Sequence, residues 1–144
     1  MLPEIKCLEL SLDQGLLLIG GGRDDDNGIA RLLVIAFDES FKLFESQTIG
    51  PQSMNCVYSL TRMPFENLFF AGGYGSVSSF YLDEKTKKIS SLRDFEDIMS
   101  GEILDLKFEK EVLYVLSPTQ EDIARLNFSK TKTGVQESQD RSES

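Results

Sequence analysis

The chain has 144 residues, of which 40% are hydrophobic, and this is enough for one domain with an apolar core. Its 15 basic and 24 acidic residues give a formal net charge of −9, which argues against nucleic-acid phosphates and anionic membrane surfaces as partners. With no histidine and only two cysteines, the composition excludes a Ser-His-Asp triad, a His-ligated zinc site and a disulfide framework.

In chain order, the sequence predicts short strands separated by polar turns rather than helices. Runs rich in Val, Ile, Leu, Phe and Tyr alternate with clusters of Gly, Pro, Asn, Asp and Ser, which favour turns. The predicted strands are 5–11, 16–22, 30–37 and 41–49, then 54–63, 68–73, 77–82 and 89–95, then 101–108, 112–117 and 123–128. The second and third runs of each group are almost continuously apolar, which indicates burial on both faces of a sheet.

Several markers recur along the chain at a similar spacing. The tetrapeptide "IARL" occurs at 29–32 and 123–126, an offset of 123 − 29 = 94, or twice 47. The apolar residues Phe37, Leu82 and Phe128, each followed by polar residues, are 82 − 37 = 45 and 128 − 82 = 46 apart. Gly20 and Gly72 are 72 − 20 = 52 apart, and Cys7 and Cys56 are 56 − 7 = 49 apart. These spacings predict an internal repeat, with the two cysteines on corresponding strands of neighbouring units.

The segment "LELSLDQGLLLIGGGRDDDNGIARLLVIAFD" has the rhythm of a known repeat family. A strand leads to a Ser-x-Asp-x-Gly-like turn at Ser11–Gly15, and a later strand ends in the pair Phe37-Asp38. Over about residues 5–130 the chain resembles the WD40-like β-propeller family. The Trp-Asp and Gly-His signatures of that family are missing, so kelch-like and quinoprotein-like propellers remain alternatives.

The resemblance implies an all-β fold of about two and three-quarter four-stranded antiparallel blades within residues 1–130. The expected blades are about 5–50, 51–98 and 99–130, the last without its outer strand. They form an open arc or part of a larger ring, with apolar faces that include parts of 7–10 and 113–116. The polar segment 131–144 is expected to be a disordered tail.

The stretch "LIGGGRDDDNGIARLLVIAF" raises the question of a phosphate or calcium loop. A phosphate loop is disfavoured, because acidic residues follow Gly22 and a strand comes next instead of a helix. An EF-hand loop that begins at Asp24 fails, since Gly28 and Ile35 occupy its fifth and twelfth positions. We therefore interpret Asn27-Gly28 as a hairpin turn, with an irregular calcium site as the alternative.

The candidate binding residues lie at predicted loop tips: Arg23, Asp24, Asp25, Asp26 and Tyr74. Tyr74 either anchors a partner or covers the neighbouring blade. No catalytic residues, metal or cofactor are expected, and both cysteines are interpreted as small buried hydrophobic residues.

These patterns together favour a noncatalytic protein-interaction scaffold. Its expected partner is a protein, with self-association or a further chain to complete the propeller as options. The alternative is a propeller-type enzyme, such as a calcium-dependent lactonase or hydrolase. With no signal-peptide pattern and no apolar run of about 18 residues, a cytoplasmic location is expected, or a nuclear one.

Overall fold

The protein is an all-β structure built from three antiparallel sheets, as the sequence predicts. The computed structural model describes residues 4–22, 31–49, 56–64, 66–117, 122–131 and 134–143, and within these ranges it contains strands and no helix. Each sheet has four strands paired in chain order, and every neighbouring pair is antiparallel. We refer to β1–β4, β5–β8 and β9–β12 as sheet 1, sheet 2 and sheet 3.

The strand bounds follow the apolar runs closely. Sheet 1 contains β1 (Glu4–Ser11), β2 (Leu16–Gly22), β3 (Arg31–Phe37) and β4 (Leu43–Ile49). Sheet 2 contains β5 (Ser59–Arg62), β6 (Leu68–Gly72), β7 (Val77–Asp83) and β8 (Lys88–Phe95). Sheet 3 contains β9 (Asp105–Glu109), β10 (Val112–Leu116), β11 (Asp122–Thr131) and β12 (Gly134–Glu143).

The last strand, β12, differs from the sequence-based expectation of a disordered tail after residue 130. It pairs with β11 along its whole length, from Asp122 opposite Glu143 to Thr131 opposite Gly134. Sheet 3 therefore has four strands, and the expected two and three-quarter units become three complete ones. Composition gives no signal for such a strand, because an edge strand is held through backbone hydrogen bonds and can be polar throughout.

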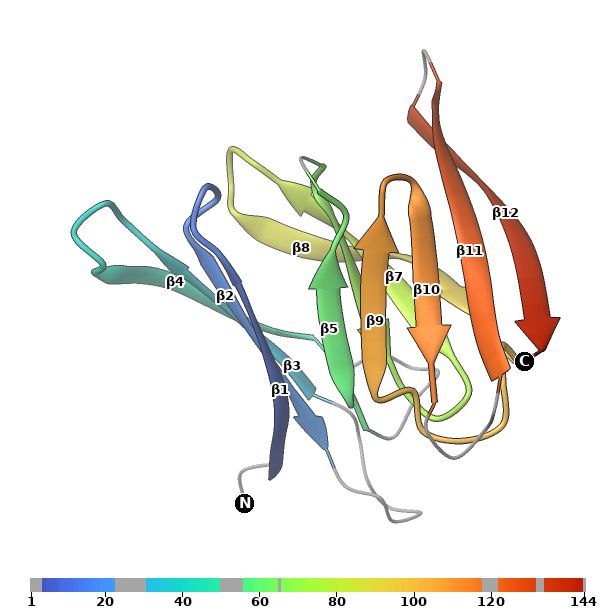
Figure 1. Cartoon of the computed structure of the whole chain (residues 1–144). Coiled ribbons are helices and arrows are strands. Elements are labelled where there is room, and N and C mark those ends of the chain that lie inside the picture. The colour runs from blue at the N-terminus through green and yellow to red at the C-terminus, as the bar shows by residue number, and fades with distance from the viewer. Residues whose placement is uncertain are drawn as a thin grey trace.

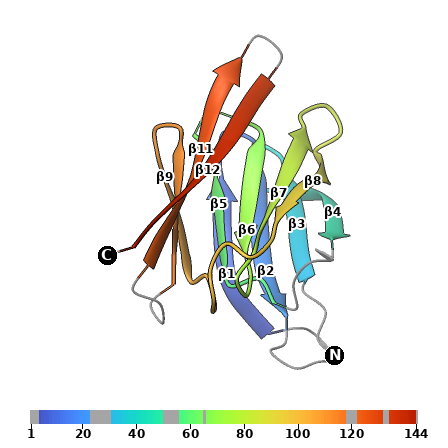
Figure 2. The same cartoon turned by 90° about the vertical axis from the view of Figure 1, so that its right-hand side faces the viewer.

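The three sheets are stacked face to face with two apolar cores between them (Figures 1 and 2). Phe69 and Phe70 are neighbours on β6, so their side chains point to opposite faces of sheet 2. Phe69 belongs to the core shared with sheet 1, and Phe70 belongs to the core shared with sheet 3. The strand β6 is therefore buried on both faces, which explains the continuous apolar run "LFFAG".

The sheets converge on their first strands and diverge toward their last ones. Contacts between sheets join β1 to β5 and β5 to β9. In Figure 1, β4 and β12 lie far apart on opposite sides of the molecule, with β1, β5 and β9 between them. The last strand of each sheet leads into the first strand of the next, through the connections at 50–58 and 96–104. The arrangement is thus a fan of three sheets.

The repeat is visible in a backbone hydrogen bond that occurs once in each sheet. The amide of Phe37 donates to the carbonyl of Gly15, that of Leu82 to Asn67, and that of Phe128 to Glu111, at 2.7–2.9 Å. In each case the acceptor immediately precedes the second strand of the sheet. The predicted spacings of 45 and 46 residues are therefore confirmed.

A second recurring feature is a notch at the end of the second strand, which we call the glycine notch. A Cβ added to Gly20 would lie 2.6 Å from Val57 Cγ1, and one added to Gly72 would lie 2.7 Å from Ile103 Cγ2. Each notch thus receives an apolar residue from the connection that leads into the next sheet, at a distance that no side chain on the glycine would permit.

The prediction that Cys7 and Cys56 occupy corresponding strands of neighbouring units is wrong. Cys7 pairs with Gly20 and Ser59 pairs with Gly72, so Ser59 is the counterpart of Cys7. The side chains at these positions donate to the connection that leads into the next sheet: Cys7 Sγ to the carbonyl of Val57 at 3.6 Å, and Ser59 Oγ to that of Ile103 at 2.8 Å. Cys56 instead precedes β5 and forms an isolated bridge with Gly22.

The "IARL" copies are also out of register. The equivalent residues Phe37 and Phe128 are 128 − 37 = 91 positions apart, whereas the tetrapeptides are 94 apart. Their recurrence therefore does not mark corresponding positions. The repeat itself is confirmed by the strand hydrogen bonds and by the spacing of 52 between the two notch glycines.

The environment of Cys7 predicts low thiol reactivity. Burial raises the pKa of Cys7 to about 12, so the thiol remains protonated, and Cys56 is buried in the core. We expect Ellman's reagent at pH 7.5 to react slowly with the folded chain and rapidly in 8 M urea (about the usual unfolding concentration). Because the pKa of Cys7 is raised in the folded chain, the protonated thiol contributes fully to folding stability below the ordinary pKa of 9.0. This contribution is lost as the pH rises toward 12. Equal rates of reaction with Ellman's reagent for the folded chain and for the chain in urea would contradict the described burial of the two thiols.

Candidate functional site

Tyr74 lies in the turn between β6 and β7, where 65% of its surface is exposed. Its backbone forms an isolated bridge with Glu102, in the connection between β8 and β9. The residue is therefore fixed at its backbone while its ring remains in solvent. An exposed ring on a fixed backbone suits an aromatic anchor, because the backbone has little conformational entropy left to lose on binding.

The Tyr74 turn is held against the β8–β9 connection by backbone hydrogen bonds. The amide of Gly75 donates to the carbonyl of Gly101 at 2.7 Å, and the amide of Ile98 donates to the carbonyl of Gly75 at 2.8 Å. Gly75 has a φ of 73°, and a Cβ at this position would collide with the carbonyl oxygen of Met99. Only glycine fits here, so the turn and the connection form one rigid unit.

An open pocket of about 360 Å³ lies between this turn and the connection. It is lined by Tyr74, Gly75, Ser76, Glu96, Asp97, Met99 and Ser100. The hydroxyl oxygen of Ser76 is buried in the wall and has no hydrogen-bond partner among the described residues. A buried hydroxyl without a partner is costly, so it is available to bond a ligand.

The charge of the pocket defines what it can bind. Glu96 and Asp97 contribute two carboxylates, no lysine or arginine is among the lining residues, and Tyr74 contributes an aromatic ring. Carboxylates attract a cation, and an aromatic face adds a cation–π contribution of about 0.5–1 kcal/mol at exposed sites. The pocket therefore suits an ammonium or guanidinium group.

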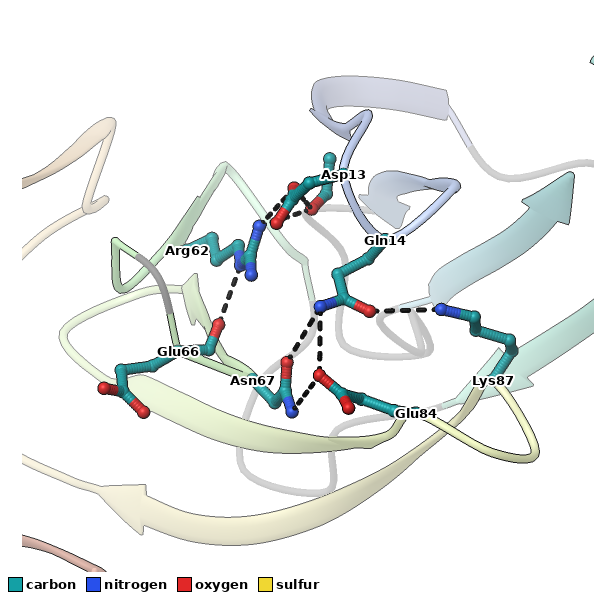
Figure 3. A network of polar contacts seen from close by, with 8 residues as sticks. Asp13, Gln14, Arg62, Glu66, Asn67, Glu84 and Lys87 are labelled. Atoms are coloured by element: carbon teal, nitrogen blue, oxygen red, sulfur yellow. Dashed lines mark hydrogen bonds and ion pairs between the residues drawn. The ribbon is translucent and has the colours of Figure 1, made fainter. Parts of the chain in front are cut away.

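A polar network occupies the opposite end of the sheets and joins sheet 1 to sheet 2 (Figure 3). Gln14, in the β1–β2 turn, donates to Asn67 Oδ1 and to Glu84 Oε1 at 3.2 Å, and accepts from Lys87 Nζ at 3.1 Å. These bonds use the amide's donor and acceptor, which specifies how the two sheets align. We regard this network as structural.

An ion pair between Arg62 and Asp13 completes the network. Arg62 donates to Asp13 and, at 2.8 Å, to Ser11 Oγ. Its Nε also donates to the carbonyl of Glu66 at 2.7 Å. The hydrogen bond from Arg62 lowers the pKa of Asp13 below its usual value of 3.8, because it stabilises the charged carboxylate.

Removing this ion pair should therefore be visible in a titration. In an Arg62→Gln variant we expect the pKa of Asp13 to rise toward 3.8, as measured by carboxyl carbon NMR. Since the pKa of Asp13 is depressed in the folded chain, the ion pair with Arg62 contributes to folding stability above pH 3.8, and this contribution is lost as the pH falls. Arg93→Gln is the control, because Arg93 lies over Phe95 instead. An unchanged Asp13 titration in Arg62→Gln would show that the pair does not form in solution.

Of the candidate residues, Arg23, Asp24, Asp25 and Asp26 lie outside the described residues, and so does the hairpin turn expected there. Tyr74 is described and borders the pocket. Sequence reasoning did not single out the other polar residues used in the argument for this pocket, Ser76, Glu96 and Asp97. The signal for them was weak, because an acidic pair in a connection between repeats usually indicates only a solvated turn.

The remaining features of the described residues do not add a second site. Within the described ranges, no three His, Cys, Asp or Glu side chains cluster in a way that could hold a metal ion. No described helix is long and apolar enough to span a membrane. Comparison of the sequence with protein-family models and with curated proteins finds no match.

Proposed function

We propose that this protein is a noncatalytic scaffold of the WD40-like β-propeller type, which binds other proteins through the Tyr74 pocket. Three consecutive four-stranded sheets, fanned around their first strands and connected from last strand to first strand, support the propeller interpretation. In such folds rigid sheets hold loops in place, and the loops carry the binding residues. We further propose a reducing compartment, the cytoplasm or the nucleus, from the low cysteine content.

The pocket is the observation that carries the proposal. It combines an exposed tyrosine, two carboxylates and a buried hydroxyl without a partner on a rigid backbone. These groups match a lysine or arginine side chain of a partner protein. The ring would contact its aliphatic stem and charged head, the carboxylates would pair with its charge, and Ser76 Oγ would accept one of its N–H groups.

Fluorescence anisotropy with labelled peptides tests this proposal. We expect peptides with a central lysine or arginine to bind the full chain, and peptides with glutamate at that position not to bind. A Glu96→Gln/Asp97→Asn variant should weaken binding by about tenfold or more, because it removes both carboxylates. The control variant, Asp105→Asn/Glu109→Gln, makes the same change of charge on exposed residues of β9.

Two results would contradict the proposal. If both double variants weaken binding equally, net charge and not the pocket attracts the peptide. If the chain hydrolyses lactones or esters when calcium is added, the protein is an enzyme and the scaffold proposal fails.

A further inference from the structure

One face of sheet 1, which we call the free face, is apolar although no described element packs on it. Strand pairing places Leu8 opposite Ile19 and Leu10 opposite Leu17, and Ile19 and Leu17 lie opposite Leu33 and Ile35. Side chains of paired residues point to the same side of an antiparallel sheet. The face thus contains Leu8, Leu10, Leu17, Ile19, Leu33 and Ile35.

The same positions in the other two sheets are buried beneath a preceding sheet. Leu8 corresponds to Leu60 and Leu106 by its place in the first strand, and these three residues are 60%, 8% and 5% exposed. Ile35 corresponds to Phe80 and Leu126, both of which are almost fully buried. Sheet 1 therefore has the side chains of a covered sheet on a face that nothing described covers.

Ile5 occupies the same position in the repeat as the two residues that fill the glycine notches. Val57 and Ile103, the residues that fill the two notches, stand two positions before Ser59 and Asp105, and Ile5 stands two positions before Cys7. Both Val57 and Ile103 are fully buried, whereas Ile5 is 65% exposed. Ile5 thus has the chemistry and position of a notch-filling residue but lacks a notch.

A second copy of the chain cannot supply that notch. If the sheets of two copies stacked in the same order, sheet 3 of one copy would face sheet 1 of the other. In sheet 3, however, Leu116 occupies the position that Gly20 and Gly72 have in the strand pairing. The first strand of that surface carries Asp105, Lys107 and Glu109, which are all exposed. Burying these charges against leucines would be strongly unfavourable. The first strand of sheet 3 is thus polar on its outward side, as is typical of a terminal repeat.

We infer that the free face of sheet 1 docks a further four-stranded antiparallel sheet of the same kind, supplied by another polypeptide segment and carrying a glycine at the end of its second strand. That glycine receives Ile5, and a serine or cysteine on the neighbouring strand donates to the Ile5 carbonyl, as Ser59 and Cys7 donate to Ile103 and Val57. The inference rests on the propeller arrangement in the proposed function but does not involve the Tyr74 pocket.

The test appends a matching sheet to the full chain. A second copy of residues 4–55 is placed directly before Glu4, so that Ile5 follows it at the spacing at which Val57 follows the original segment. The readout is maleimide labelling of Leu8→Cys in the original sheet 1, whose counterparts Leu60 and Leu106 are buried, in a background with Cys7→Ser in both copies and Cys56→Ala. We expect the added repeat to slow this labelling by about tenfold or more, because the residue becomes buried. The matched control carries Gly20→Leu in the added copy only and should leave the labelling fast.

Each other outcome overturns the inference. Fast labelling with the unmodified added repeat, whether that repeat is folded or unfolded, shows that the face does not take such a sheet. Equal protection by the Gly20→Leu control shows that the notch does not select the partner. Labelling of the unappended chain that slows with its concentration shows that a second copy covers the face. Peptide binding at the Tyr74 pocket is measured on the same proteins, so failure of the docking and failure of the proposed function are distinguished.

Discussion

Replacing Phe70 with alanine should lower the free energy of unfolding by about 3–5 kcal/mol, as measured by urea denaturation followed by circular dichroism. Phe70 is 1% exposed in the core between sheets 2 and 3. Its ring centroid lies 5.2 Å from that of Phe108 and 5.1 Å from that of Phe128, both in edge-on geometry. The substitution thus removes a large buried side chain and two aromatic contacts across the interface.

The same substitution at an exposed site provides the control. Phe41 is 74% exposed, and Phe41→Ala should cost less than about 1 kcal/mol. If the two variants lose similar stability, Phe70 is not in a core and the packing of sheet 3 on sheet 2 is wrong. A large loss at Phe70 with little at Phe41 supports the interface.

Replacing Gly72 with valine should destabilise the chain by about 1–3 kcal/mol or more, because it overfills the glycine notch. A Cβ here would collide with Ser59 Oγ and lie 3.2 Å from the Cβ of Ile103, which cannot move without its backbone. We expect the loss to increase from Gly72→Ala to Gly72→Val in thermal melts. A flat series would mean that the notch is open in solution.

A double-mutant cycle shows whether the loss comes from Ile103. In a Gly72→Ala/Ile103→Ala variant the shortened partner removes the 2.7 Å contact with Ile103 Cγ2, while the contact with Ser59 Oγ remains. The double variant should therefore be more stable than the sum of the single effects predicts. Leu16→Ala, at a buried site in the other core, is the control partner and should give additive effects. Additivity in both pairs would contradict a specific notch.

The strands could be predicted from the sequence where burial requires a continuous run of apolar residues. Runs such as 68–72 are continuously apolar because sheet 2 is covered on both faces, and the turns between runs carry Gly, Asn and Asp. The strand β12 left no such mark, since its pairing depends on backbone groups that every residue has.

The repeat register and the site were harder to predict, for different physical reasons. Cys7 and Cys56 looked equivalent because both precede apolar runs, but hydrogen bonding makes Ser59 the counterpart of Cys7. Tyr74 could be identified as a candidate because it lies in a glycine-rich turn. Glu96 and Asp97 could not, because only the fold brings the β8–β9 connection beside that turn.

Cysteine labelling at three equivalent positions tests the central claim, that three repeated sheets stack in order and leave one face of sheet 1 open. Leu8→Cys, Leu60→Cys and Leu106→Cys are made singly in the Cys7→Ser/Cys56→Ala background of the unappended chain at low concentration. Maleimide should react with position 8 about tenfold or more faster than with positions 60 and 106, because only position 8 lacks a covering sheet. Equal protection of all three positions would show that sheet 1 is covered from both sides within a closed structure, and would contradict the account.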